Sequence, residues 1–216
     1  MNIICCGQSQ HGFCKGKSCL TNLLEFLEGV NKHVDQGDPV DIVYLDFQKA
    51  FDKVPHQRLL RKVICHGIRG KVLSWISNWL KDSKQRVGIN GQFSEQREVN
   101  SGVPQGSVLG PVLFIIFIND LEKGVNSEVA KFADDTKLLK IVKSQADCEE
   151  LQKALSKLGD WATKWQMKFN IDKCKVMHIG KHHPNYTYKM MGSKLAVTTQ
   201  ERDLGVIVDS SLKTSS

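Results

Sequence analysis

Two acidic stretches decide the fold of this chain: Phe132-Ala133-Asp134-Asp135, and the earlier run Ile42-Val43-Tyr44-Leu45-Asp46. The apolar, β-prone residues of the second run predict a buried strand that ends at Asp46. Around the first stretch, residues 129–132 and 136–141 are predicted as two strands that are joined by the turn Ala133-Asp134-Asp135. Carboxylates on rigid elements are what a pair of divalent ions about 3.5–4 Å apart requires. The two stretches therefore predict a two-metal phosphoryl-transfer site.

The composition is that of an ordinary globular domain. The chain has 216 residues, of which 41% are hydrophobic and 25% are charged, so it is long enough to bury a sizeable core. Its formal net charge of +7 favours a polyanionic partner such as nucleic acid, although many globular proteins are equally basic. Seven scattered cysteines indicate a reducing, intracellular compartment, cytoplasmic or nuclear. We expect no signal peptide and no membrane partner, because the longest apolar run, 108–118, is too short to span a bilayer.

The order of the other elements predicts an α+β protein. The segment Asn90-Gly91 is a strong hairpin signal, and Trp75, Ile76, Trp79 and Leu80 are expected on one buried helix face. Helices are expected over 20–34, from Pro55, around Trp75, over 109–121 and from a capping box at Ser144 and Asp147. Further strands are expected over 85–90, 92–99, 174–179, 186–190, 195–197 and 204–208. This order approximates a split β-α-β, ferredoxin-like sheet with helices on one face, as in a polymerase palm.

Three local patterns have competing interpretations. Gly16-Lys17-Ser18 imitates the end of a P-loop, but His11 occupies the place of its first glycine, so only a phosphate-touching basic loop or a solvated turn remains. The irregular set Cys5, Cys6, His11, Cys14 and Cys19 is interpreted as chance thiols and not as a zinc site. The set Cys174, His178, His182 and His183 suggests metal ligands, but strand-edge residues and a His-rich turn are favoured.

Three ordered segments resemble the motifs of reverse transcriptases: Leu45 to Pro55, Ser101 to Pro111, and Phe132-Ala133-Asp134-Asp135. The resemblance is strongest to retrotransposons that lack long terminal repeats, of the jockey-type clade, and it runs from about Gln10 to Asp209. Phe132 replaces a tyrosine that is common in the family, and Cys14 stands where an arginine often follows Gly-Phe.

The resemblance implies a catalytic role for four residues. Asp46 and Asp134 would hold two Mg²⁺ ions, which Mn²⁺ can replace, and Asp135 would be a supporting carboxylate; turn formation and strand-end capping are the structural alternative. Lys173 would protonate the departing pyrophosphate, with a solvated lysine as an equal alternative.

The resemblance also implies nucleotide, template and primer contacts. Phe51 would exclude a ribose 2′-hydroxyl, with core packing as a serious rival, and Gln105 beside Gly106 would lie against the template. The implied nucleotide and template residues are Phe47, Phe51, Gln105, Gly106, Lys15 and Lys17, and the implied primer grip is Leu204, Gly205 and Val206.

The expected domain plan is a truncated polymerase. Residues 1–39 would be a partial fingers segment, 40–180 the palm with finger-side helices and a hairpin over about 55–100, and 181–216 the start of the primer-grip and thumb region. The expected activity is RNA-directed DNA synthesis from an RNA template, a DNA primer and deoxynucleoside triphosphates. The alternatives are an inactive remnant that at most binds nucleic acid, and a template-independent, metal-dependent phosphotransferase on the same carboxylates.

Overall fold

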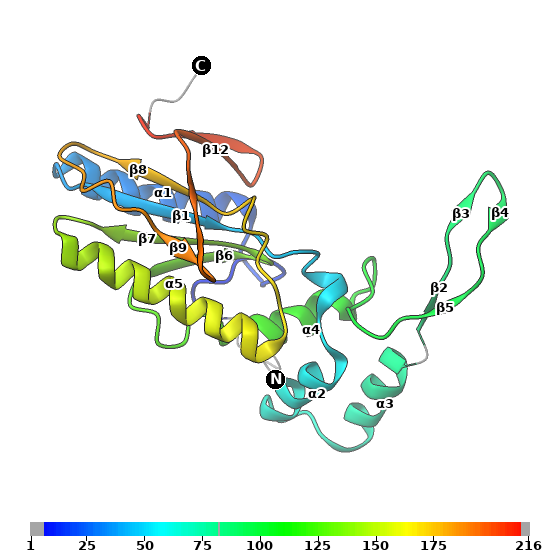
Figure 1. Ribbon diagram of the computed structural model, residues 1–216. Helices are drawn as coiled ribbons and strands as arrows, with labels where there is room; N and C mark the ends of the chain where they lie inside the picture. Colours follow the sequence, from blue (N-terminus) through cyan, green and yellow to red (C-terminus); the bar gives the residue numbers. More distant parts are fainter. Residues whose placement is uncertain (1–6, 82, 213–216) are drawn as a thin grey trace. The chain divides into compact units, whose positions relative to one another are not determined.

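A computed structural model describes residues 7–81 and 83–212 (Figure 1). Within these residues the chain forms two compact units, one from residues 49–118 and the other from residues 7–48 and 119–212. The division falls inside the predicted 40–180 palm, and the assignment of fingers, palm and thumb to these units stays a prediction.

The larger unit is built on a five-stranded sheet with the order β11-β8-β1-β7-β6. Its central strand, β1 (Val40–Leu45), is antiparallel to both of its neighbours, β7 (Asp135–Ile141) and β8 (Lys175–Ile179). The strand β6 (Glu128–Phe132) pairs antiparallel with β7, and β11 (Ala196–Val197) pairs parallel with β8. The structure confirms the predicted strand that leads to Asp46, the Asp-Asp hairpin and the predicted strand over 174–179, which is β8.

Two helices cover opposite faces of this sheet (Figure 1). From α1 (Cys19–Asp35), Phe26 and Val30 pack in one core cluster with Ile42 of β1. Side chains alternate between the two faces of a strand, so Asp41 and its cross-strand partner Lys140 lie on the other face, where the Lys140 ammonium contacts a carboxylate of α5 (Gln145–Trp165). The predicted capping box of Ser144 and Asp147 starts α5. The α+β class is confirmed, and α1 adds a helix on the second sheet face.

Short hairpins complete the larger unit. The strands β9 (Lys189–Met190) and β10 (Ser193–Lys194) pair with each other, as do β12 (Gln200–Asp203) and β13 (Val206–Asp209). The prediction of one strand over 204–208 is wrong at its start, because Leu204 and Gly205 have φ of 47° and 91° and form the turn between β12 and β13. Only the second half of that apolar run is extended, since left-handed backbone breaks a strand.

The smaller unit is a set of helices with a two-part hairpin. Its elements are η1 (Phe51–Lys53), α2 (His56–Cys65), α3 (Gly70–Lys81), β2 (Lys84–Gln85), β3 (Gly88–Ile89), β4 (Gln92–Phe93), β5 (Arg97–Glu98) and α4 (Leu109–Ile118). The hairpin turn at Asn90-Gly91 is confirmed, with positive φ at both residues. The expected core face of α3 is only partly right: Ile76 and Leu80 are buried, but Trp75 is 58% exposed.

The described cysteines include both a disulfide-bonded residue and free thiols. Cys14 is disulfide-bonded, so the interpretation of its segment as chance thiols fails there, whereas Cys19, Cys65, Cys148 and Cys174 are free thiols. Cys5 and Cys6 lie outside the described residues.

Across the described part of the chain, no helix is long and apolar enough to cross a membrane.

Candidate active site

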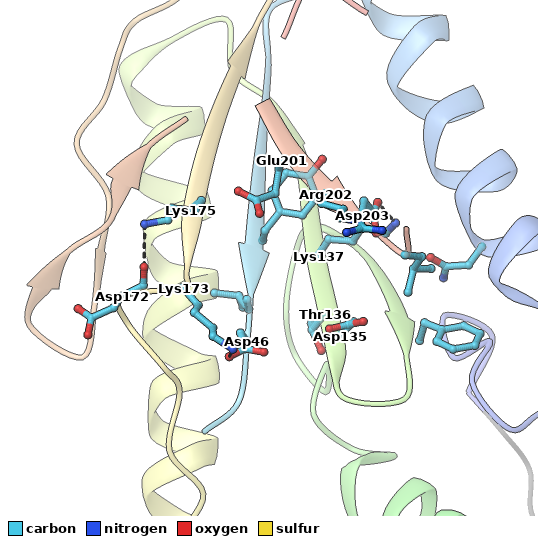
Figure 2. A pocket seen from close by; sticks show the side chains of 15 residues that line it. Asp46, Asp135, Thr136, Lys137, Asp172, Lys173, Lys175, Glu201, Arg202 and Asp203 are labelled. Carbon is cyan, nitrogen blue, oxygen red and sulfur yellow. Dashed lines mark hydrogen bonds and ion pairs between the residues drawn. The ribbon is translucent and has the colours of Figure 1, made fainter. Parts of the chain in front are cut away.

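The predicted catalytic aspartates gather at one end of the five-stranded sheet. In the antiparallel pair of β1 and β7, Leu45 lies opposite Thr136. The next residues along the two strands are Asp46, directly after β1, and Asp135, the first residue of β7; Figure 2 shows both at the ends of these neighbouring strands. Asp134 precedes Asp135 in the turn from β6. The sheet register therefore brings three carboxylates together that are up to 89 positions apart in the chain.

The turn that carries Asp134 has a strained backbone and a dedicated support. Ala133 has φ of 55°, which is uncommon for a residue with a side chain. The buried Gln10 side chain holds it: Gln10 Oε1 accepts the N–H groups of Gly12 at 2.7 Å and Ala133 at 2.9 Å, and Gln10 Nε2 donates to the Ala133 carbonyl at 3.1 Å. Gly12 lies so close that an added Cβ would be 2.2 Å from the Ala133 nitrogen.

The carboxylates of the site repel one another. Desolvation raises the pKa of Asp134, and the nearby Asp46 carboxylate adds to the shift. The Asp135 side chain reaches solvent, but the protein around its carboxyl limits hydration; this desolvation and the charges of Asp134 and Asp46 raise the pKa of Asp135 to about 6. A divalent cation would relieve this repulsion, so the charge and the oxygen donors of the site fit such an ion.

The spacing of the three acids also limits how an ion could be shared. Oxygen ligands of one Mg²⁺ lie at 2.0–2.1 Å from it, so no two of them are more than about 4.2 Å apart. Among the described residues, the three acids do not form a group with ligand atoms all within 4.8 Å of one another. A single ion could therefore touch all three only after side-chain rotation.

Two lysines flank the acids in different ways. Lys173 is exposed, and its Nζ lies 3.7 Å from Asp46 Oδ2. Lys137 of β7 is buried in an ion pair with Asp203 of β12, so it ties the Leu204-Gly205 hairpin to the strand that carries Asp135. A pocket of about 400 Å³ lies between them; Asp46, Asp135, Lys137, Lys173, Asp203 and Leu204 are among its lining residues (Figure 2). Of the implied primer grip, Leu204 therefore faces the pocket, while Gly205 and Val206 are exposed.

The other implied contacts in the larger unit are placed differently. Lys15 is exposed and Lys17 bonds the Gln8 carbonyl, both in the loop before α1. The Phe47 ring is buried and stacks on Phe169, with the ring centroids 4.2 Å apart. Because that ring is covered, a nucleotide could contact Phe47 only through the main-chain atoms of this residue.

The remaining implied residues lie in the smaller unit. Phe51 is half-buried and stacks on Phe114, with 4.3 Å between the ring centroids. Gln105 and Gly106 are exposed, in a loop that is anchored by two backbone hydrogen bonds of 2.8 Å, one from the Gly102 N–H to the Val54 carbonyl and one from the Val103 N–H to the Phe51 carbonyl. The second and first sequence motifs of the resemblance are therefore bonded to each other.

The residues that support the acids could not all be recognised from the sequence. Nothing local to Gln10 and Gly12 shows that they contact a turn more than 120 positions later. Lys137 did carry a signal: a lysine within the apolar run of β7 needs a buried partner, which Asp203 supplies.

Comparison with known proteins identifies a matching family model and similar proteins. Residues 4–206 match the family model described as reverse transcriptase (RNA-dependent DNA polymerase). The chain is 34% identical over 185 residues to the RNA-directed DNA polymerase from mobile element jockey of Drosophila funebris, covering 78% of this chain and 19% of that protein. It is 30% identical over 212 residues to the probable RNA-directed DNA polymerase from transposon BS of Drosophila melanogaster, covering 93% of this chain and 22% of that protein. The chain thus spans about a fifth of the length of these relatives.

Solved structures agree on the fold. Apo telomerase from Candida tropicalis superposes with a TM-score of 0.60 at 12% sequence identity, covering 94% of this chain and 36% of that one. Telomerase from Candida albicans in complex with a fragment of telomeric RNA gives a TM-score of 0.58, also at 12% identity, and covers 96% of this chain and 36% of that one.

Proposed function

We propose that this chain, which belongs to the reverse transcriptase (RNA-dependent DNA polymerase) family, extends a DNA primer with deoxynucleotides along an RNA template. The observation that carries the proposal is the convergence of Asp46, Asp134 and Asp135 at one end of the sheet, on strand ends whose register is fixed by β1 and β7. Template, primer and deoxynucleotides are proposed on the strength of the family and of relatives named as RNA-directed DNA polymerases.

The three carboxylates would hold two divalent ions, with Mg²⁺ as the ion that best suits hard oxygen donors and Mn²⁺ as its substitute. Such ions, when bound, lower the barrier to attack of the primer 3′-hydroxyl on the α-phosphate and stabilise the leaving pyrophosphate. Asp46 and Asp134 supply the ligands, and Asp135 adds negative charge beside them. Lys173, which lies 3.7 Å from Asp46, stands where it could give a proton to the pyrophosphate.

Phe51 would favour binding of a deoxynucleotide over a ribonucleotide. Its ring is fixed by the stack on Phe114, so it would act as a rigid wall against a 2′-hydroxyl. Substitution of Phe51 by valine should therefore raise ribonucleotide incorporation relative to deoxynucleotide incorporation. An unchanged ratio would leave the ring with the packing role alone.

The proposal is tested by primer extension on an RNA template with Mg²⁺. Asp46→Asn and Asp134→Asn should each abolish incorporation, because each removes a ligand charge. Asp172→Asn is the matched control, since Asp172 lines the same pocket but its side chain is exposed and its interaction with Lys175 uses the backbone carbonyl. Equal extension by all four proteins would refute the catalytic assignment.

The same assay separates the alternative functions. Salt-dependent RNA binding without incorporation would indicate the inactive remnant, to which the net charge of +7 would give affinity for phosphates. Phosphoryl transfer that proceeds equally with and without template would indicate the generic phosphotransferase.

A further inference from the structure

A second polar cluster lies at the opposite end of β1 from the aspartate site. Asp41 is five positions before Asp46, which is about 16 Å along an extended strand. Its carboxylate is fully buried, and its cross-strand partner on β8 is His178. His183, from the loop that follows β8, comes to the same point. Asp41, His178 and His183 form the group of metal-ligand residue types that the described residues bring within 4.8 Å of one another.

The two imidazoles converge on one carboxylate oxygen. His178 Nδ1 lies 2.5 Å and His183 Nε2 lies 2.7 Å from Asp41 Oδ1, and the two ring centroids are 4.4 Å apart. The other oxygen, Asp41 Oδ2, accepts a hydrogen bond of 2.5 Å from the hydroxyl of the buried Tyr188. Tyr188 thereby fixes the rotation of the carboxylate and leaves Oδ1 for the two rings, as outer partners do in metal sites.

The His183 imidazole is buried beside Asp41 but is not well hydrogen-bonded to it. Its side chain is only 6% exposed, and its Nε2 lies 2.7 Å from Asp41 Oδ1 as an ion pair whose direction is not that of a well-formed hydrogen bond. A buried polar atom without a well-directed hydrogen bond is uncommon in folded proteins. The atom points into the group formed with Asp41 and His178, where a cation would satisfy it.

We propose that Asp41, His178 and His183 bind a divalent transition-metal ion such as Zn²⁺. Two imidazole nitrogens and one carboxylate oxygen are a donor set that suits Zn²⁺, which takes nitrogen and oxygen ligands at about 2.0–2.2 Å in tetrahedral geometry. Mg²⁺ prefers oxygen ligands, so the nitrogen donors separate this site from the carboxylate site at the other end of β1. The ion would fasten the loop after β8 to the central strand of the sheet.

Binding requires small rearrangements that can be measured. Donors around a tetrahedral zinc are about 3.3 Å apart, so the contacts of 2.5 and 2.7 Å would open by less than 1 Å through side-chain rotation. The Asn185 N–H now donates to His183 Nδ1 at 2.9 Å. Coordination through Nε2 moves the single proton of the neutral His183 imidazole from Nε2 to Nδ1, so the Asn185 amide must give up this bond.

The test titrates the purified chain with Zn²⁺ alone and, in parallel, with Co²⁺, whose visible spectrum reports tetrahedral coordination. The wild type should bind one ion at this site, with a higher melting temperature, a tetrahedral Co²⁺ spectrum without thiolate bands, and loss of the Asn185 amide hydrogen bond by NMR. His183→Asn should weaken this binding by more than about 10-fold, the loss that even a change in an outer partner causes.

The neighbouring residue offers a matched control. His182 is exposed, and its φ of 57° is one that asparagine tolerates, so His182→Asn should bind the ion like the wild type. Asp134→Asn should also bind it normally, which separates this site from the proposed catalytic one. Circular dichroism without metal checks the fold of each variant.

Equal zinc affinity of His183→Asn and His182→Asn would overturn the proposal. So would a wild type that gives no tetrahedral Co²⁺ spectrum and no change at Asn185, a result that would leave the cluster as a hydrogen-bonded network. Neither outcome depends on polymerase activity.

Discussion

The side chain of Gln10 should carry much of the stability of the Asp134 turn. Three hydrogen bonds join it to the Gly12 and Ala133 backbones, and each contributes about 0.5–1.5 kcal/mol net. Gln10→Ala also leaves buried backbone groups without partners, so we expect a loss of about 2–4 kcal/mol in the free energy of unfolding. The turn should then relax from the positive φ of Ala133, which displaces Asp134.

Urea denaturation measures the stability change, and primer extension measures its effect on the site. A displacement of about 1 Å in a catalytic group can cost about 10²-fold in rate, so incorporation should fall by roughly that factor in Gln10→Ala. Gln8→Ala is the control, because the Gln8 side chain is exposed and its change should stay within about 0.5 kcal/mol. A Gln10→Ala protein as stable as the Gln8→Ala control would refute this account of the turn.

Three further predictions follow from neighbouring contacts. Gly12→Ala should destabilise the chain by about 1–3 kcal/mol and impair incorporation, because its Cβ would lie 2.2 Å from the Ala133 nitrogen. Gly159→Ala is the control and should be tolerated, because its Cβ meets only a side-chain atom, at 3.4 Å. Equal melting temperatures of the two variants would contradict the predicted clash at Gly12. Asp135→Asn should stabilise the chain above pH 6, because the raised pKa of about 6 makes ionisation of Asp135 unfavourable to folding. That advantage should vanish as the pH falls from 6 to below 4, where the carboxyl is protonated in both states; denaturation across pH checks this, and a pH-independent difference would contradict it. Lys137→Met should cost about 3–5 kcal/mol because it leaves Asp203 buried and unpaired, whereas Lys137→Met with Asp203→Leu should recover most of the loss in the same denaturation assay.

Sequence patterns were enough for the main elements of the palm sheet and for the place of its acids. The apolar, β-prone composition of β1, β6 and β7 is a local property, and Asp46 and Asp135 fall next to the ends of these strands. The antiparallel pairing of β1 with β7, which the structure shows, then brings these ends together. The capping box of α5 and the Asn90-Gly91 turn are equally local and were predicted for the same reason.

Features that depend on distant contacts could not be predicted in this way. Trp75 shares the helical period of Ile76 and Leu80, but period alone does not tell which side of an apolar stripe meets a partner. The run from Leu204 to Val208 is apolar throughout, so its turn at Leu204-Gly205 was hidden by composition. His178 and His183 were considered as metal ligands and set aside, because Asp41 is brought to them only by the pairing of β8 with β1.

The geometry of the aspartate site is unfavourable in both its backbone and its charges. Ala133 is strained and the charges of Asp46, Asp134 and Asp135 repel, so the turn would not keep this geometry in isolation. Its support comes from outside the turn, because Gln10 is contributed by the segment before α1. The supported turn keeps the carboxylates near one another, and a cation would relieve their repulsion once the side chains rotate to meet it. The loop around Gln10, which the sequence motifs do not include, is for this reason as much a part of the site as the strands that carry its acids.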